Sequence, residues 1–387
     1  MSVTGILNGS DLEKTPVWGG HDQPWILLWS RNELPNLDED ELFLLTPLRE
    51  NALSKRGEFR LDYQSAYPVP LRAVIEKSWL CKSLSIGTKL DFEVMEKITR
   101  LADQQCIGSF WKEGHDTFML RSNRGIDLAP WKDEPQPKWL SDLLVADIEI
   151  ENAKDSLIDV KVPTFLEKFG DKRPHCHYQE LNYMAPMVLI RRAPGEDRFR
   201  QKSFLFSEGS RCFTKNYFGY TGGNHPLANV LVSLLHVIAQ SSLFLFFSYM
   251  RSKQIGATRR IVDKRDIDAF PLPIPDDLSS TQKQSILDFA KLIDQNLVDY
   301  GKLDRFVCEL FGLNLMEQQV VEDTVTFNGP FGSGRKIAAE PVRSPEATAF
   351  ASILQTSLQP LFSVTGQQVN VALVSRLEGD WEQPWRF

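Results

Sequence analysis

The chain has 387 residues, of which 42% are hydrophobic and 25% charged, and its formal net charge is −7. This length allows a large core and two or three domains, and the composition is that of an ordinary soluble protein. The opening MSVTGILNGSDLEKTP has neither a basic start nor an apolar core, so we expect no signal peptide. The five cysteines form no C-x-x-C pair, so we expect neither a disulfide framework nor a zinc ribbon. Both expectations fit a cytoplasmic location.

Residues 1–85 are predicted to form an N-terminal docking arm with short strands. "WILLWS" and "ELFLLTPL" are strand-like runs, whereas "YPVPLRAV" contains too much proline for a central strand. Trp18, Trp25 and Trp29 are predicted to cover apolar surface on a partner chain, because aromatic residues are enriched at interface cores.

A helix is predicted to begin near Thr88, which stands three residues before Asp91 as in a capping box. Leu90, Val94, Ile98 and Leu101 then follow at helical spacing. The next run, "QQCIGSFWKEGHDTFML", alternates in a way that favours β structure, and "PWKDEPQP" at 130–137 is a loop. "WLSDLLVADIEIENAKDSLIDVKVPTF" is expected to form a helix and then strands.

The segment from 185 to 250 is predicted to contain strands followed by one long core helix. "APMVLIRRAP" is an apolar strand that ends in a basic pair, and "KSFLFSEGSRCFTKNYFGYTGG" is rich in β and turn signals. Asn224 is expected to cap the helix, whose apolar stripe begins at Leu227 and continues through "SSLFLFFSYM". A membrane span is the rival interpretation, disfavoured because polar residues such as Ser233 and His236 interrupt the run.

The remaining sequence predicts one amphipathic helix, a linker and a small closing unit. "STQKQSILDFAKLIDQNLVDYGKLDRFVCELFGL" has helical spacing, and residues 326–345 are a flexible linker. Residues 346–387 are expected to form a small α/β unit, with "EATAFASILQTSLQPLF" as helix and "QQVNVALVSRL" as strand. The main domain then spans residues 86–325.

Positive charge is concentrated in one part of this acidic chain. Residues 187–265 hold 13 Lys and Arg against 4 Asp and Glu, a local net charge of +9, so the remainder carries −16. This asymmetry indicates a face that binds a polyanion, although the same residues could be solvated sides of strands and helices. The candidate contact residues are Arg191, Arg192, Lys202, Arg211, Lys215, Arg251, Lys253, Arg259, Arg260, Lys264 and Arg265.

Three other motifs have residue types that suit catalysis or metal binding. His175, Cys176 and His177 resemble half of a zinc site, but no second cluster completes four ligands. Asp147, Asp159 and Lys161 have spacing found in metal-dependent nucleases, a pattern easily met by chance. "PFGSGRK" at 330–336 lacks both the spacing of a phosphate loop and a strand leading into it. We therefore predict no catalytic residue and no metal ligand.

The order of segments resembles a known family. The strand "APMVLIRR", the β-rich stretch, the aromatic helix and the basic turn precede "DIDAFPLPIP", in which Asp266, Ile267, Phe270, Pro271, Leu272 and Pro273 match a D-I-x-x-F-P-[IL]-P pattern. "SWLCKSLSIGTKLD" and "IDQNLVDYGKLDRFVCELFGLNLMEQQVVED" are also similar to family segments. Across residues 40–325 the chain resembles the TaqI-like C-terminal specificity region of adenine-N6 DNA methyltransferases of restriction–modification and phage-defence systems.

The resemblance implies a mixed α/β (α+β) fold, with a target-recognition domain of β-sheet and packed helices. It also implies a subunit that reads double-stranded DNA, because the family's glycine-rich cofactor loop and its Asn-Pro-Pro-aromatic catalytic motif are missing here. A separate catalytic methyltransferase subunit would then bind S-adenosylmethionine, giving a hetero-oligomer without membrane contact and no cofactor in this chain. The alternatives are a scaffold subunit that does not bind DNA and a metal-dependent nuclease.

Overall fold

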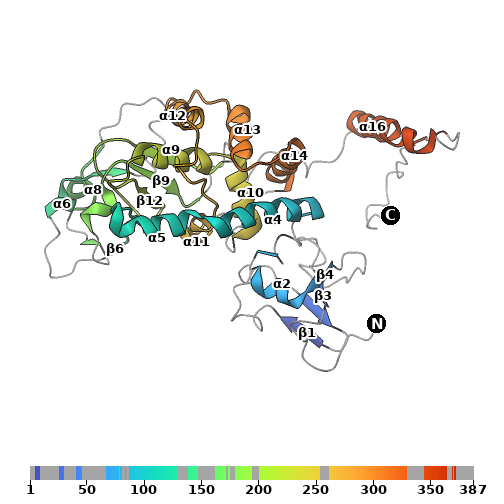
Figure 1. Cartoon of the computed structure of the whole chain (residues 1–387), viewed down its shortest axis with the longest axis horizontal. Helices are drawn as coiled ribbons and strands as arrows, with labels where there is room; N and C mark the ends of the chain where they lie inside the picture. Colours follow the sequence, from blue (N-terminus) through green and yellow to red (C-terminus); the bar gives the residue numbers. More distant parts are fainter. Residues whose placement is uncertain are drawn as a thin grey trace. The chain divides into compact units, whose positions relative to one another are not determined.

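The structure is a computed structural model and describes residues 5–8, 26–29, 41–45, 67–77, 79–80, 83, 87–129, 138–146, 162–170, 173–174, 179–193, 200–252, 261–328, 344–363, 368 and 370–371. The chain divides into two compact units, Met1–Arg335 and Lys336–Phe387. Figure 1 shows their elements in chain order. The boundaries inferred from sequence, at 85, 325 and 345, stay predictions.

The helices of the first unit are α2 (Leu71–Glu76), α4 (Lys89–Gln104), α5 (Ile107–Thr117), α6 (Lys138–Ser141), α8 (Phe165–Phe169), α9 (Ala228–Ala239), α10 (Ser242–Arg251), α11 (Lys264–Asp268), α12 (Ser280–Asp294), α13 (Tyr300–Leu310) and α14 (Leu315–Asp323). Its strands are β1 (Gly5–Asn8), β2 (Ile26–Trp29), β3 (Glu41–Leu45), β4 (Tyr67–Pro70), β5 (Ser122–Arg124), β6 (Leu128–Ala129), β7 (Leu144–Ala146), β8 (Arg173–Pro174), β9 (Met187–Arg191), β10 (Ser203–Phe206), β11 (Arg211–Phe213) and β12 (Tyr217–Thr221). The predicted mixed α/β fold class is confirmed.

The N-terminal strands form an antiparallel sheet in the order β1-β2-β3-β4. β4, the proline-containing strand, lies at one edge, where missing backbone donors are tolerated. Trp29 ends β2 and pairs with Gly5 of β1. Trp18 and Trp25 lie outside the described residues, so the predicted partner contact of these tryptophans stays a prediction.

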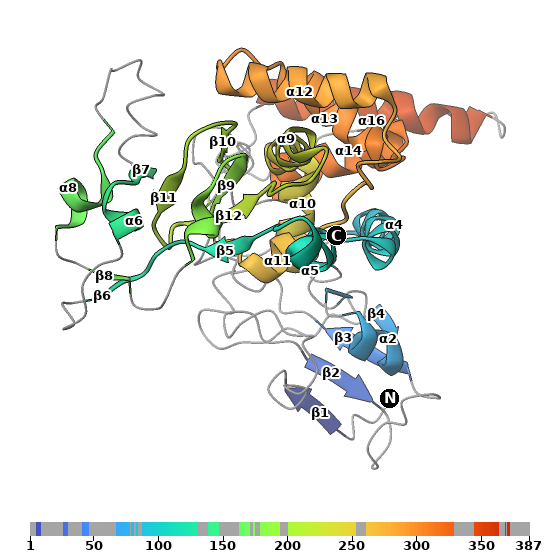
Figure 2. The ribbon, with the colours of Figure 1, turned by 60° about the vertical axis from the view of Figure 1, so that its left-hand side comes forward.

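The central sheet has the order β10-β9-β12-β5, and its neighbouring strands are antiparallel. β9 is buried along nearly its whole length, as its apolar sequence predicts. Because side chains alternate, Val188 and Ile190 join the large hydrophobic cluster on one face, whereas Met187 and Leu189 join a second cluster on the other. Figure 2 shows α9 and α12 on the side of the large cluster and β11 and β7 on the side of the second cluster.

The long core helix predicted over 227–250 is in fact two helices, α9 and α10, whose axes differ by 68°. The break follows from local capping: the Ser241 hydroxyl accepts a hydrogen bond from the backbone N–H of Phe244 at 3.2 Å and starts a new helix. Within the described part of the chain, no single helix is long and apolar enough to span a membrane, although this bent pair passes by length and composition.

Two further sequence predictions are wrong. Residues 107–117 form the helix α5 rather than β structure, because Cys106 and Ser109 make a capping box and Ile107 and Trp111 face the core at helical spacing. Asn224 does not cap α9. The His225 ring nitrogen Nδ1 accepts instead from the backbone N–H of Leu227 at 3.1 Å, and α9 begins at Ala228.

The C-terminal part is helical, as predicted, but the single amphipathic helix predicted there is two helices, α12 and α13. Asn296 has a positive φ of 58° after α12, and Asp299 then caps α13 through the backbone N–H of Lys302 at 3.2 Å. In the second unit, α16 (Ser344–Ser363) confirms the predicted closing helix. The strand predicted after it falls largely outside the described residues.

Candidate nucleic-acid interface

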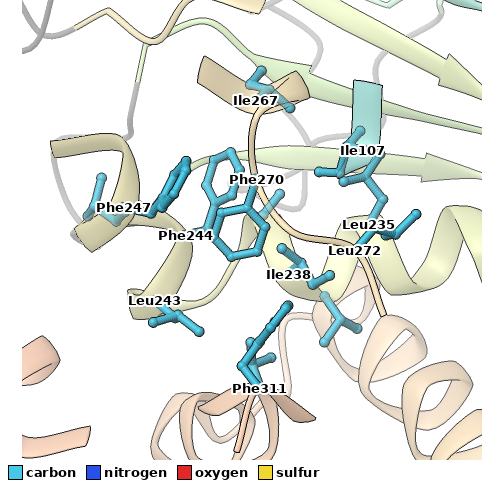
Figure 3. Packing of buried hydrophobic residues seen from close by; sticks show 14 of the residues in the cluster. Ile107, Leu235, Ile238, Leu243, Phe244, Phe247, Ile267, Phe270, Leu272 and Phe311 are labelled. Carbon is cyan, nitrogen blue, oxygen red and sulfur yellow. The ribbon is translucent and has the colours of Figure 1, made fainter. Parts of the chain in front are cut away.

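The motif that carries the family resemblance forms part of the hydrophobic core. Phe270 is fully buried, and its ring lies 5.2 Å from that of Phe244, 5.1 Å from that of Phe247 and 5.4 Å from that of Phe311. Figure 3 shows these rings meeting between helices that are distant in sequence. The backbone N–H of Ile107 donates to the Phe270 carbonyl at 2.9 Å. This motif therefore joins α5 to the core, and its one charged side chain, Asp266, accepts a hydrogen bond from the backbone N–H of Asp263 at 3.3 Å.

The second recognisable motif, "GTKLD", is also structural. Thr88 and Asp91 form the predicted capping box of α4, and Asp91 is buried. The Thr324 hydroxyl donates a hydrogen bond to the remaining oxygen of Asp91. One carboxylate thus caps α4 and ties it to the turn after α14, while the exposed Lys89 of the same motif lies 3.9 Å from Glu93.

The described residues on either side of the basic segment 253–260 are held together, and their junction is called the loop base below. Ser252 ends α10 and is buried, and its hydroxyl donates to the Ile261 carbonyl at 3.4 Å. The backbone N–H of Val262 donates to the Arg192 carbonyl at 2.8 Å, which fixes the loop base beside the end of β9. Lys253, Arg259 and Arg260 lie between, outside the described residues, so their DNA contacts stay predictions.

Four of the candidate cations gather at the same end of the central sheet. Arg191 ends β9, and its backbone N–H donates to the Lys202 carbonyl at 2.8 Å. The backbone N–H of Arg192 donates to the carbonyl of Asn216, the neighbour of Lys215, at 2.7 Å. These bonds bring Arg191, Arg192, Lys202 and Lys215 to the loop base, which the sequence alone could not show.

Arg211 lies at the opposite end of the sheet. Its guanidinium lies 5.5 Å from the ring of Phe206, which pairs with Met187 at the start of β9. The Arg211 side chain also donates to the Ser210 carbonyl at 2.9 Å. Arg211 is therefore separated by the length of β9 from Arg191 and the cations beside it.

Acidic residues neutralise much of the charge at the loop base. Arg192 lies 3.6 Å from a carboxylate oxygen of Asp263, and Lys215 lies 2.9 Å from one of Asp127. Such partly exposed pairs contribute little stability and leave less net positive charge for a polyanion. The excess of +9 counted along the sequence therefore overstates the charge presented here.

Lys264 belongs to a partly buried polar network that fastens α11 to the sheet. Its ammonium donates to the Asp268 carboxylate at 2.7 Å and to the Ser122 hydroxyl at 3.1 Å. The Tyr220 hydroxyl donates to the other oxygen of Asp268 at 2.8 Å. Burial and the Asp268 charge raise the pKa of Tyr220 well above its usual value, so this hydroxyl stays protonated as a donor.

Two arginines at this end are exposed and, among the described residues, form no ion pair or hydrogen bond through their side chains: Arg265 and Arg124. Arg265 follows Lys264 on α11. Arg124 shares a strand face with Ser122, the hydroxyl that Lys264 reaches, so it lies on the side of the sheet that α11 covers. Sequence reasoning missed Arg124. The alternation within "SNR" could have suggested it only once β5 was known as an edge strand.

Arg251 differs from the other candidates because it is half-buried at the end of α10. Its guanidinium lies 5.8 Å from the ring of Phe247. Burial lowers the pKa of Arg251 below its usual value, and the nearby carboxylate of Asp266 partly offsets that effect. It lines a pocket between helices rather than the exposed end of the sheet.

The described residues contain one serine–histidine–aspartate chain, and it lies in the core. His236 is fully buried, with its Nδ1 2.9 Å from the Ser203 hydroxyl and its Nε2 3.6 Å from Asp294. Ser203 is buried within β10, where a substrate carbonyl has no access. We assign this chain of groups to packing between β10, α9 and α12.

The other catalytic and metal-binding motifs of the sequence lie outside the described residues. The His175–His177 segment and the residues Asp147, Asp159 and Lys161 are all in this position. Across the described ranges, no group of three or more His, Cys, Asp or Glu could hold a metal ion.

No protein-family model matches the chain, and no curated protein sequence matches it. Among solved structures, the type IIG restriction endonuclease BpuSI is similar over 68% of this chain and 36% of its own, with 16% sequence identity and a TM-score of 0.37. This chain thus spans about a third of that enzyme's length. A likeness this distant to a restriction enzyme carries no argument about function.

Proposed function

We propose that this chain is the DNA target-recognition component of an adenine-N6 methyltransferase of a restriction–modification or phage-defence system. A separate catalytic subunit would bind S-adenosylmethionine and transfer the methyl group. The observation that carries the proposal is the loop base formed by Ser252 and Ile261, which stands beside Arg192 at the sheet end where Arg124 and Arg265 are exposed. The ordered family segments in the sequence support it.

The arrangement suits a division of labour that protein–DNA interfaces use. Phosphate contacts orient a protein on the duplex and come mainly from Arg and Lys, while base edges are read by a few side chains. Here Lys264 is tied to Asp268 and Ser122 and would hold α11 in place. In the described part of the chain Arg124 and Arg265 have no such partners, and we take them to be available to phosphates. A recognition subunit of this kind would hold the duplex while the target adenine is flipped into the partner's active site.

The test is the salt dependence of duplex binding by the full chain with its catalytic partner. Each phosphate contact adds about 0.9 to the slope of log affinity against log salt concentration. The double variant Arg124→Ala, Arg265→Ala should flatten that slope by nearly two units. The matched control is Lys291→Ala, Arg305→Ala, which removes two exposed cations from α12 and α13 and should leave the slope unchanged.

A second variant, Arg259→Ala with Arg260→Ala, tests the loop itself. Its slope should fall by a similar amount if both residues contact phosphate. If one of them contacts a guanine instead, the choice of base at one position should relax. Slopes equal to that of the control for both variants, together with an unchanged methylation pattern, would contradict the proposal.

One observation favours a second candidate, a scaffold subunit that no longer binds DNA. The chain is acidic overall, and Arg192, Lys215 and Lys264 are all paired with aspartates at the sheet end. Phosphate attraction supplies much of DNA affinity, so such pairing weakens the first proposal. If this chain is a scaffold, the complex should bind a DNA duplex with the same affinity whether or not the chain is present.

A further inference from the structure

The strand β5 forms one edge of the central sheet, and in the described part of the chain it pairs with β12 alone. In an antiparallel pair, residues that exchange backbone hydrogen bonds alternate with residues that do not. The N–H of Gly125 donates to the Tyr217 carbonyl at 3.0 Å. At the other end of the strand, the N–H of Thr221 donates to the Arg121 carbonyl at 2.8 Å. Because every second residue is bonded, the backbone N–H of Arg124 points away from β12, toward the free edge.

This outward N–H belongs to an exposed residue. Within the described ranges, Arg124 forms no hydrogen bond through its backbone N–H and no ion pair through its guanidinium. A backbone donor and a cation are therefore presented at the same point of the edge. The plain alternative to a binding role is protection, because a charged side chain keeps a free edge from pairing with another strand.

The charges beside this edge favour an anionic partner. β5 and α11 together carry three cations and two carboxylates: Arg124, Lys264, Arg265, Asp266 and Asp268. Asp268 accepts from Lys264 at 2.7 Å and from the Tyr220 hydroxyl at 2.8 Å. Asp266 accepts from the backbone N–H of Asp263 at 3.3 Å. Both carboxylates thus have donors, and the positive charge in excess belongs to the exposed arginines.

We propose that the backbone N–H of Arg124 donates a hydrogen bond to a phosphate of the DNA duplex, and that the guanidinium of the same residue binds that phosphate. A phosphate supplies both the negative charge and the acceptor oxygens that these two groups require. Phosphate contacts from backbone N–H groups orient a protein on a duplex and carry no sequence information. The inference rests on the proposed DNA recognition and gives the sheet edge a positioning contact within it.

The test separates the N–H from the side chain in the full chain, with a short DNA duplex as the probe. The α-hydroxy acid analogue of arginine, placed at position 124 by cell-free translation, keeps the guanidinium and replaces the N–H with an ester oxygen. Duplex affinity at fixed salt should fall about tenfold or more, the scale of a hydrogen bond to a charged group. The slope of log affinity against log salt concentration should stay unchanged, because the guanidinium still neutralises the phosphate.

The matched control is the same ester at Leu205 of β10, the opposite edge of the sheet (Figure 2). The N–H of Arg191 donates to the Lys202 carbonyl at 2.8 Å, so by the same alternation the N–H of Leu205 points away from β9. This ester should bind the duplex as the parent does. An equal loss of affinity in both ester variants would mean that the ester weakens the sheet, which overturns the proposal.

Two encoded variants make the same comparison. Arg124→Ala and Arg124→Pro both lose the guanidinium, but only proline lacks the N–H, and an edge strand tolerates proline where the N–H faces outward. Both salt slopes should be about 0.9 lower than that of the parent. The proline variant should bind about tenfold more weakly than the alanine variant. Equal affinities would contradict the proposal. If proline lowers the melting temperature, the ester comparison decides.

The remaining outcomes identify other roles for the edge. A duplex of unrelated sequence should lose affinity by the same factor, because a phosphate contact reads no base. A loss confined to one sequence would assign the N–H to base reading and overturn the phosphate contact. A parent that dimerises without DNA, with an Arg124 ester variant that does not, would show that β5 pairs with a second copy of the chain, which also overturns it.

The inference and the proposed function can fail separately. If Arg124→Ala with Arg265→Ala flattens the salt slope while the Arg124 ester binds as the parent does, the recognition function stands and the backbone contact is wrong. If the parent binds no duplex, both are wrong.

Discussion

Phe270 and Arg265 lie on the same short stretch of chain, but the protein uses them in opposite ways. Phe270 is fully buried and touches three other phenyl rings, whereas Arg265 is exposed and contacts no other charged group among the described residues. The recognisable D-I-x-x-F-P-L-P motif thus belongs to the core, and the cations beside it belong to the surface. A resemblance in the motif therefore implies a similar packing of the core, whereas DNA binding would depend on the surface cations.

The comparison also shows how much of the basic segment is structural. Lys264 stands next to Arg265, but its ammonium is bound by Asp268 and lies 5.3 Å from the Tyr220 ring. Adjacent residues of like charge therefore have different roles. A charge count along the sequence does not separate them, because it ignores both the pairing with Asp268 one helical turn away and the distant partner Ser122 that the fold supplies.

The largest effect is expected at the motif. Phe270→Ala removes a ring packed against Phe244, Phe247 and Phe311, and should lower the free energy of unfolding by about 3–5 kcal/mol. Denaturant titration followed by circular dichroism measures this loss. Phe270→Leu, which keeps most of the volume, should cost less than half as much. A loss below about 1 kcal/mol for the alanine variant would show that the ring is not central to the core.

The polar network under α11 should give an intermediate effect. Asp268→Asn keeps the shape but removes the charge that binds Lys264, and should cost about 1–3 kcal/mol of unfolding free energy. Tyr220→Phe, which removes one hydrogen bond and leaves Lys264 paired, is the matched control and should cost about 1 kcal/mol. Equal stability of both variants and the parent would mean that α11 is held by apolar packing alone.

A smaller effect is expected at the cap of α4. Thr88→Ala removes the hydroxyl that accepts from the backbone N–H of Asp91 at 3.4 Å, and should cost about 1 kcal/mol. Thr88→Ser keeps the oxygen and should recover most of the loss. Equal melting temperatures for Thr88→Ala and Thr88→Ser would refute the capping role.

Several local features could be predicted from sequence because neighbouring residues decide them. The start of α4 follows from Thr88 and Asp91, which lie within one turn of each other. The buried strand β9 follows from an unbroken apolar run. In both cases the interaction that forms the element lies within a few residues, and sequence reasoning can therefore identify it.

Other features were decided by contacts between distant segments. Periodicity extended one helix across the Ser241 break, and alternation at 104–120 hid α5, which is fixed in the core by the bond between Ile107 and Phe270. For the candidate site, sequence reasoning found Arg192, Lys264 and Arg265 but neither Arg124 nor the pocket around Arg251. Those required knowing which strand is an edge and which helix faces which.

The sequence by itself determined the fold class, the capped helix α4, the apolar strand β9 and the concentration of positive charge between 187 and 265. Only the tertiary structure decided which of those charges are free. Asp127, Asp263 and Asp268 reach Lys215, Arg192 and Lys264 across the fold or from the adjoining turn, and Arg251 loses its water to the helices around it. The physical reason is that Coulomb interaction and desolvation depend on distance in space, which the order of residues along a chain does not set.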